Sequence, residues 1–220
     1  MSNLLNTTTP SIFRRVFNLY RELIRSRKSQ IVLMLKVFVF AVIVGAFSYN
    51  FQPDLLENIL KFFQDKFGGI ESDQQLTSAI FIQNIESALF ALIGGLILGI
   101  IPILFMATNG FLIGFVIVAL FVLNDAPIIP KVIYTLAGLL PHGIFEIPAV
   151  LLAAAFGWNL GTRFLIRPQP GITRWQVFKQ GIKETLLIIP LIVLLLAIAV
   201  VVEVYFTGYL VELCITYLNI

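Results

Sequence analysis

Five long apolar runs divide the chain, and most charged residues lie in the segments between them. The runs cover residues 31–49, 88–107, 111–123, 141–160 and 186–206. A helix needs about 20 predominantly apolar residues to cross a bilayer core of about 30 Å. The run 111–123 is short for a crossing, which indicates a tilted helix or a locally thinner bilayer. The pattern predicts an all-α fold, a polytopic membrane helical bundle of about five transmembrane helices.

Two interruptions of the apolar pattern predict where the chain turns. The letters ATNG at residues 107–110 separate the second run from the third, and they predict a turn so tight that the next helix lies alongside. Residues 128–140 predict a half-helix that leads into the fourth span. One helix over residues 131–160 would be about 45 Å long at 1.5 Å per residue, too long for one crossing. We therefore expect a helix break at Pro141, His142 and Gly143.

Amphipathic segments flank the spans at three places. In residues 1–30, apolar side chains from Ile12 to Ile24 line one face opposite the arginines, and Thr9 is placed to cap the helix. This segment predicts a helix on the cytoplasmic leaflet. A similar stripe from Leu56 to Phe67 predicts either an interfacial helix or a partner-docking groove. The tail 207–220 is predicted as a third amphipathic helix.

The basic residues predict the orientation of the bundle. Eleven of the fifteen lysines and arginines lie in residues 1–30 and 161–183, whereas the loop 50–83 holds five acidic and two basic residues. Because lysine and arginine collect on the cytoplasmic side, we expect a cytoplasmic segment 1–30 and a transmembrane domain 31–206. Within that domain, the loop 50–83 is outside and the loop 161–183 is cytoplasmic. The N-terminus is then cytoplasmic and the C-terminus is outside.

Composition supports a membrane protein over a soluble one. Apolar residues make up 59% of the chain and charged residues only 12%, against about a quarter charged in soluble domains. The net charge of +3 comes from residues sorted between loops, and no nucleic-acid recognition module is visible. The single cysteine, Cys214, cannot form an intramolecular disulfide. We therefore expect the lipid bilayer, and not nucleic acid, to surround this chain.

Small residues recur at four-residue spacing in three of the runs. Such spacing lets helix backbones approach closely in lipid, where no hydrophobic force drives helices together. It predicts that the middle spans form one tight bundle. The residues concerned are Ala91, Gly95 and Gly99, then Gly110 and Gly114, then Ala153, Gly157 and Gly161.

The only histidine and a glutamate lie four residues apart in the fourth run. His142 and Glu146 share one face of a helix, and a carboxylate inside a bilayer needs a partner. Candidate partners are Asn84, Glu86 and Asn109. If a helix starts at residue 141 on the outer surface, His142 and Glu86 lie at one level and Asn109 at the cytoplasmic end. The alternatives are a structural hydrogen bond, a site for an ion, proton or small ligand, and a metal site.

Two stretches resemble the stage II sporulation protein M family of integral membrane proteins. They are ALFALIGGLILGIIPILFMATNGFLIGF, at residues 88–115, and LLPHGIFEIPAVLLAAAFGWNLG, at residues 139–161. The family commonly has paired asparagines where this chain has Gln83 and Asn84. Its most specific motifs are TNG and PHGIFE, whose residues include Thr108, Asn109, Gly110, Pro141 and Gly143.

The resemblance implies a multi-pass protein of the plasma membrane that organises cell-envelope partners which remodel peptidoglycan. We therefore expect a non-enzymatic scaffold subunit without cofactor or bound metal, in contact with other membrane or envelope proteins or with copies of itself. A small transporter or channel with an intramembrane polar site at His142, Glu146, Glu86 and Asn84 is the alternative. A metal-dependent hydrolase that uses His142, Glu146 and Glu86 is the third hypothesis.

Overall fold

The computed structural model describes residues 11–70, 72–123, 125–163, 165, 168 and 170–218. The predicted Thr9 cap lies outside this part, with the rest of residues 1–10. Also outside it are residue 71 of the outer loop, residues 164, 166, 167 and 169 of the cytoplasmic loop, and residues 219–220. The elements are α1 (Ile12–Ser26), α2 (Lys28–Ser48), α3 (Leu55–Phe67), α4 (Asp73–Gly94), α5 (Ile100–Leu123), α6 (Ile128–Thr162), α7 (Arg174–Val201), the π-helical η1 (Val202–Thr207) and α8 (Gly208–Leu218).

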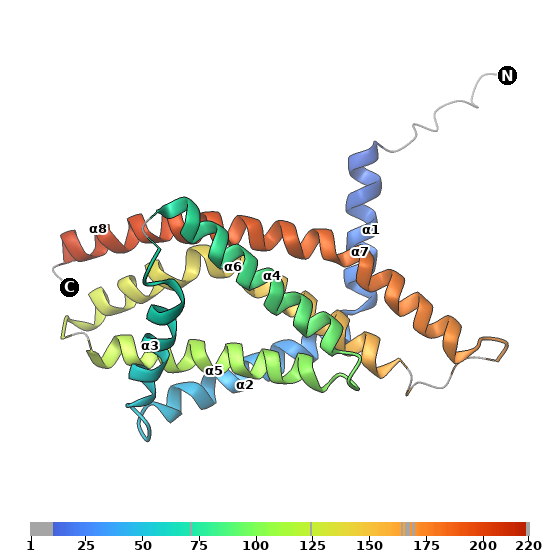
Figure 1. The fold of residues 1–220 in the computed structure, drawn as a ribbon, viewed down its shortest axis with the longest axis horizontal. Helices are drawn as coiled ribbons and strands as arrows, with labels where there is room; N and C mark the ends of the chain where they lie inside the picture. Colours follow the sequence, from blue (N-terminus) through green and yellow to red (C-terminus); the bar gives the residue numbers. More distant parts are fainter. Residues whose placement is uncertain are drawn as a thin grey trace.

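The all-α membrane bundle is confirmed. Within the described residues, five helical segments are long and apolar enough to cross a bilayer: α2, α4, α5, α6 and the continuous run α7–η1–α8. Figure 1 shows these five lying lengthwise beside one another, whereas α1 and α3 lie across the bundle near its opposite ends. The protein is therefore a multi-pass membrane protein in which α1 and α3 have the direction expected of interfacial helices.

The second and third spans differ from the prediction, because the chain turns at residues 95–99 and not at residues 107–110. Leu98 and Gly99 both have positive φ angles, 50° and 76°, and only glycine adopts this conformation without strain. Pro102 falls in the first turn of α5, where its missing N–H costs nothing. The predicted span 88–107 is thus wrong. Thr108, Asn109 and Gly110 lie in the middle of α5, where Asn109 Nδ2 donates to the Phe105 carbonyl at 2.8 Å.

The predicted break at Pro141, His142 and Gly143 is also wrong. α6 is one helix of 35 residues that contains both Pro141 and Pro148, about 52 Å long at 1.5 Å per residue. Neighbouring helices allow prolines inside membrane helices, because they shield or satisfy the freed backbone groups, and α6 packs against α4, α5, α7 and α8. Its length requires α6 to tilt or to extend beyond the hydrocarbon.

The last helix is longer than predicted at both ends. A capping box between Thr173 and Gln176 starts α7 at Arg174, within the segment 161–183 that was expected to be a loop. At the other end η1 and α8 continue the same helical run to Leu218. The segment predicted as a separate amphipathic tail is therefore an extension of the fifth span.

Glycines bring two pairs of helices into backbone contact. The pair α4 and α6 lies among the middle spans, as the four-residue spacing predicts, whereas the other pair joins α5 to the first span, α2. A Cβ atom added to Gly45 or Gly114 would overlap the backbone carbonyl of Phe111 or Val42, respectively, so α2 and α5 touch through their main chains. Gly95, directly after α4, meets α6 in the same way, since a Cβ there would overlap the Gly157 carbonyl.

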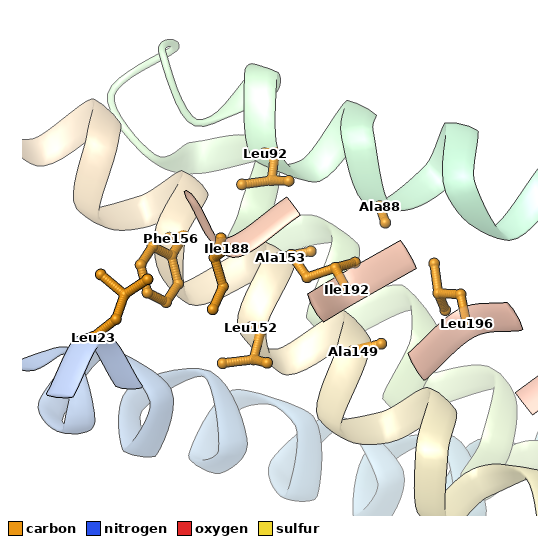
Figure 2. Packing of buried hydrophobic residues seen from close by; sticks show 10 residues of the cluster. All are labelled: Leu23, Ala88, Leu92, Ala149, Leu152, Ala153, Phe156, Ile188, Ile192 and Leu196. Carbon is orange, nitrogen blue, oxygen red and sulfur yellow. The ribbon is translucent and has the colours of Figure 1, made fainter. Parts of the chain in front are cut away.

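A central apolar cluster joins four helices around α6. Figure 2 shows its side chains converging from α1, α4, α6 and α7. Alanines on α4 and α6 leave room for larger side chains from α7, so that the layers interdigitate. The buried members are Leu23, Ala88, Leu92, Ala149, Leu152, Ala153, Phe156, Ile188, Ile192 and Leu196.

A buried ionic cluster ties three segments together at the end of the bundle where α2 and α7 begin. Glu184 of α7 forms ion pairs with Arg27, between α1 and α2, and with Arg163, after α6. Arg163 Nη2 lies 2.6 Å from the carboxylate, Gln180 Nε2 donates to it at 3.0 Å, and Arg163 Nη1 donates to the Val177 carbonyl at 3.0 Å. Burial lowers the pKa of Arg163 and the Glu184 charge raises it, and an arginine stays protonated throughout.

The glycine contacts predict a destabilised Gly114→Ala variant. We expect its free energy of unfolding to fall by about 1–3 kcal/mol, because the added methyl forces α2 and α5 apart. Gly138→Ala in α6 is the matched control, since its Cβ would meet only Val211 Cγ2, at 3.8 Å. There the better helix propensity of alanine should raise stability by up to about 1 kcal/mol. Unfolding in detergent, followed by circular dichroism, measures the free energy of unfolding of both variants. Equal changes in the two variants would contradict the close contact between α2 and α5.

The ionic cluster predicts that Glu184→Gln destabilises the bundle by about 3 kcal/mol. The substitution leaves the buried guanidinium of Arg163 and the partly buried one of Arg27 without negative charge, the costly way to break a buried ion pair. Glu212→Gln removes an exposed carboxylate of α8 and should unfold like the unmodified protein under the same conditions. Unchanged stability of Glu184→Gln would show that the cluster does not hold the helices together.

Candidate functional site

A cavity of about 770 Å³ lies among α4, α5, α6 and η1. Figure 1 shows α4 and α5 diverging from the turn that joins them. The wall of the cavity is mainly apolar, and side chains such as Leu76, Phe90, Leu104 and Val150 contribute to it. Phe67 of α3 and Leu76 of α4 mark one end of the cavity, and Ile101 near the start of α5 marks the other. The cavity therefore extends along much of the length of α4.

Seven polar side chains line the cavity, and all four surrounding helical elements contribute to them. The three on α4 share one face because they occupy positions i, i+1 and i+4. Most of them lie near the middle of their helices, away from both ends of the bundle. They are Gln83, Asn84 and Ser87 of α4, Thr108 and Asn109 of α5, Glu146 of α6 and Glu203 of η1.

Among the described residues of the lining, the two glutamates are the only ionisable groups. Both are half-buried. Neither has a hydrogen bond or ion pair with any residue in the described part of the chain. The Gln83 Oε1 atom is also buried without a partner there. The site thus offers acceptor oxygens that the protein itself leaves unused.

Glu203 lies at the start of the π-helical turn η1. A π-helix has more residues per turn than an α-helix, so it changes the register of the side chains that follow, and such turns are frequent at functional sites. In η1, Glu203 lines the cavity, whereas Thr207 is buried and its hydroxyl lies 3.4 Å from His142 Nδ1.

The structure brings some of the predicted site residues together and separates others. Asn84 and Glu146 line one cavity with Asn109, which lies in the middle of α5 and not at the cytoplasmic end as expected. Glu86 is exposed on another face of α4 and does not line the cavity. His142 contacts Thr207 instead, which is the structural hydrogen bond considered among the alternatives.

Of the residues in the TNG and PHGIFE motifs, some line the cavity and others do not. Thr108 lines the cavity beside Asn109. Gly110 faces α2, since a Cβ there would lie 2.5 Å from the Phe38 carbonyl. Pro141 and Gly143 lie in α6, outside the lining of the cavity.

Glu203 is the functional candidate that the sequence interpretation missed. It is the one acidic residue in the apolar run 186–206, and an ionisable residue inside a span indicates a functional site by default. That signal was available but was not weighed against His142 and Glu146. In the described residues, no group of three or more histidine, cysteine, aspartate or glutamate side chains gathers that could hold a metal ion.

Comparison with known proteins gives the family. Residues 34–208 match the model of stage II sporulation protein M. The chain belongs to this family. It is also 28% identical over 184 residues to an uncharacterized protein of Methanocaldococcus jannaschii, a match that covers 82% of this chain and 94% of the relative. No solved structure matches the chain. Every residue that lines the cavity lies within the part that matches the family.

Proposed function

We propose that this family member is a small transporter that binds a cation or a cationic solute in the cavity between α4, α5, α6 and η1. The observation that carries the proposal is the pair Glu146 and Glu203, which face one cavity without a partner among the described residues. A charged side chain at the bilayer centre costs about 2.5–3.5 kcal/mol on insertion scales. A bound cation would offset that cost for both carboxylates.

The depth of the polar groups supports binding inside the membrane. Asn84, Asn109 and Glu146 lie near the midpoints of α4, α5 and α6. Secondary transporters place substrate and ion sites near the bilayer midplane, beside interrupted helices. The π-helical interruption at Glu203 fits that description.

The lining also supports a non-enzymatic role. It consists of carboxylate, amide and hydroxyl groups with apolar neighbours, and His142 and Cys214 are not among them. These groups accept and donate hydrogen bonds to a polar guest.

We propose that the protein lies in the plasma membrane with its N-terminus cytoplasmic and its C-terminus outside. Residues 1–30 and 161–183 carry eleven of the fifteen basic residues, which favours the cytoplasm for that end. In this orientation α3 lies on the outer side.

A scaffold for cell-envelope partners is the second candidate function, and a groove beside α3 favours it. The groove has a volume of about 780 Å³ and lies between α3 and the outer ends of α2 and α5, where Tyr49 and Leu123 contribute to it. Its charged groups are Asp54, Glu57 and Asp65 against Lys61. That charge pattern suits a basic segment of a partner protein.

The transport proposal predicts that the cavity carboxylates, and not other carboxylates, support flux. In proteoliposomes we expect uptake of protons, sodium, potassium or tetramethylammonium by the unmodified protein. Glu146→Gln and Glu203→Gln should each lower that uptake by roughly tenfold or more, because each removes a charge that binds the cation.

Glu86→Gln is the matched control for the flux measurement, since Glu86 belongs to α4 but is exposed outside the cavity. Its uptake should equal that of the unmodified protein. Absence of flux for all four probes would remove the transport proposal. Equal loss in Glu86→Gln would show that the cavity is not the path.

The scaffold proposal predicts crosslinks from the groove and not from an exposed position of α3 outside its lining. In a Cys214→Ala background, Gln64→Cys should react with a membrane-impermeant thiol crosslinker on intact cells and capture an envelope protein. Asn58→Cys, on the same helix outside the groove, should label without that capture. Neutralising Asp54, Glu57 and Asp65 should abolish the adduct. No labelling of either cysteine from outside would contradict the proposed orientation.

A further inference from the structure

α1 lies across the bundle at the end where α2 begins (Figure 1). Its last turns are fixed by Leu23, which is buried in the central cluster with Phe156 and Ile188 (Figure 2). Its first turns leave Ile12 and Phe13 exposed. A helix that is apolar on one face, basic on the other and perpendicular to the spans lies at the interface between lipid headgroups and acyl chains. The junction of α1 with the bundle is therefore at headgroup depth.

A groove of about 630 Å³ occupies this junction, between α1, α2 and α7. Three cationic side chains, Arg21, Arg25 and Lys28, line it, and all three are exposed. The surface inside the groove is apolar, so the cations lie around its margin. The other lining residues are Phe17, Tyr20, Ile24, Ile31, Val32 and Leu191.

The three cations have no counter-charge from the described protein. Arg21, Arg25 and Lys28 form no ion pair or side-chain hydrogen bond with the described residues. Arg27, which lies between two of them in sequence, is bound by Glu184. The nearby carboxylate of Glu22 is exposed and does not line the groove. Three free positive charges therefore surround an apolar hollow.

We propose that this groove binds one anionic phospholipid, with an acyl chain against the apolar wall and the phosphate among Arg21, Arg25 and Lys28. Charge complementarity selects a phosphate, since basic pockets at the cytoplasmic side of membrane helices bind acidic headgroups. The apolar wall selects a lipid over free phosphate, because Ile31, Val32 and Leu191 offer nothing to a small hydrated ion.

The bound lipid joins α1 to α2 and α7 beside the ionic cluster. One molecule bridges the same three helices that Arg27 and Glu184 connect from the protein side. Lipid binding and the ionic cluster then hold α1 in the same position. This role is separate from cation binding in the cavity, which lies among α4, α5, α6 and η1.

The test uses delipidated full-length protein and native mass spectrometry with phosphatidylglycerol, phosphatidylcholine and inorganic phosphate as separate probes. We expect phosphatidylglycerol to bind with one tight site and the other two probes to bind far more weakly. The triple variant Arg21→Gln, Arg25→Gln, Lys28→Gln should lose affinity for phosphatidylglycerol by on the order of 100-fold, the combined effect of three interfacial cations.

The matched control removes the same charge elsewhere at that end of the bundle. Arg14→Gln, Arg15→Gln, Arg174→Gln should keep the tight site, because none of these residues lines the groove. Val32→Trp fills the groove without a change of charge and should also weaken phosphatidylglycerol binding. Equal losses in both triple variants would reduce the effect to general surface charge. Tight binding of phosphatidylcholine or of inorganic phosphate, or an unaffected Val32→Trp, would overturn the proposal.

Discussion

The separation of helix backbones is the constraint on which the rest of the structure depends. In hydrocarbon, lipid chains solvate an apolar side chain as well as another helix does, so helices associate only where close contact yields more dispersion energy and fewer gaps than lipid can. Gly45 and Gly114 provide this contact between α2 and α5, and Gly95 with Gly157 and Gly161 provides it between α4 and α6. A side chain at any of these places would overlap the facing backbone and force the two helices apart there. The positions of the polar groups therefore depend on residues that have no side chain.

The polar groups in the bundle fall into two chemically opposite sets. At one end, Glu184 accepts hydrogen bonds from two arginines and from Gln180, so its charge is compensated within the protein. In the middle, Glu146 and Glu203 face a cavity without a partner among the described residues. The glutamate that joins helices is thus paired within the protein, whereas the two glutamates that face the cavity have no partner among the described residues. This contrast favours a guest molecule as the missing partner, because the chain can evidently supply arginines where a carboxylate needs one.

The sequence was sufficient to predict the class of fold but not where the spans begin and end. Apolar length and the placement of arginines specify how many helices cross, because the bilayer itself imposes both rules. They do not distinguish a turn from a helix inside an apolar segment. The turn at residues 95–99 consists of apolar residues and glycine. Because the apolar run is not interrupted there, the hydropathy pattern predicted a span across the turn. In the same way Asn109 and Pro141 resembled breaks, although Asn109 bonds its own helix and Pro141 lies within α6. Glu203 was missed because its neighbours are as apolar as those of a lipid-facing helix, and the sequence does not show which face of the helix lines the cavity.

The position of the cavity follows from where the small residues stop. Ala91 and Gly95 of α4 touch α6 near the turn that leads into α5, where a Cβ on Gly157 would overlap the Ala91 carbonyl. Towards its N-terminus α4 carries larger side chains, among them Asn84, and it diverges from α5 (Figure 1). Two helices that are in close contact near the turn and are separated by larger side chains elsewhere enclose a space that widens away from that contact. Amide side chains from α4 and α5 line this space. A shift of the small-residue contacts along α4 would therefore change both the width of the cavity and the distance from its amides to Glu146.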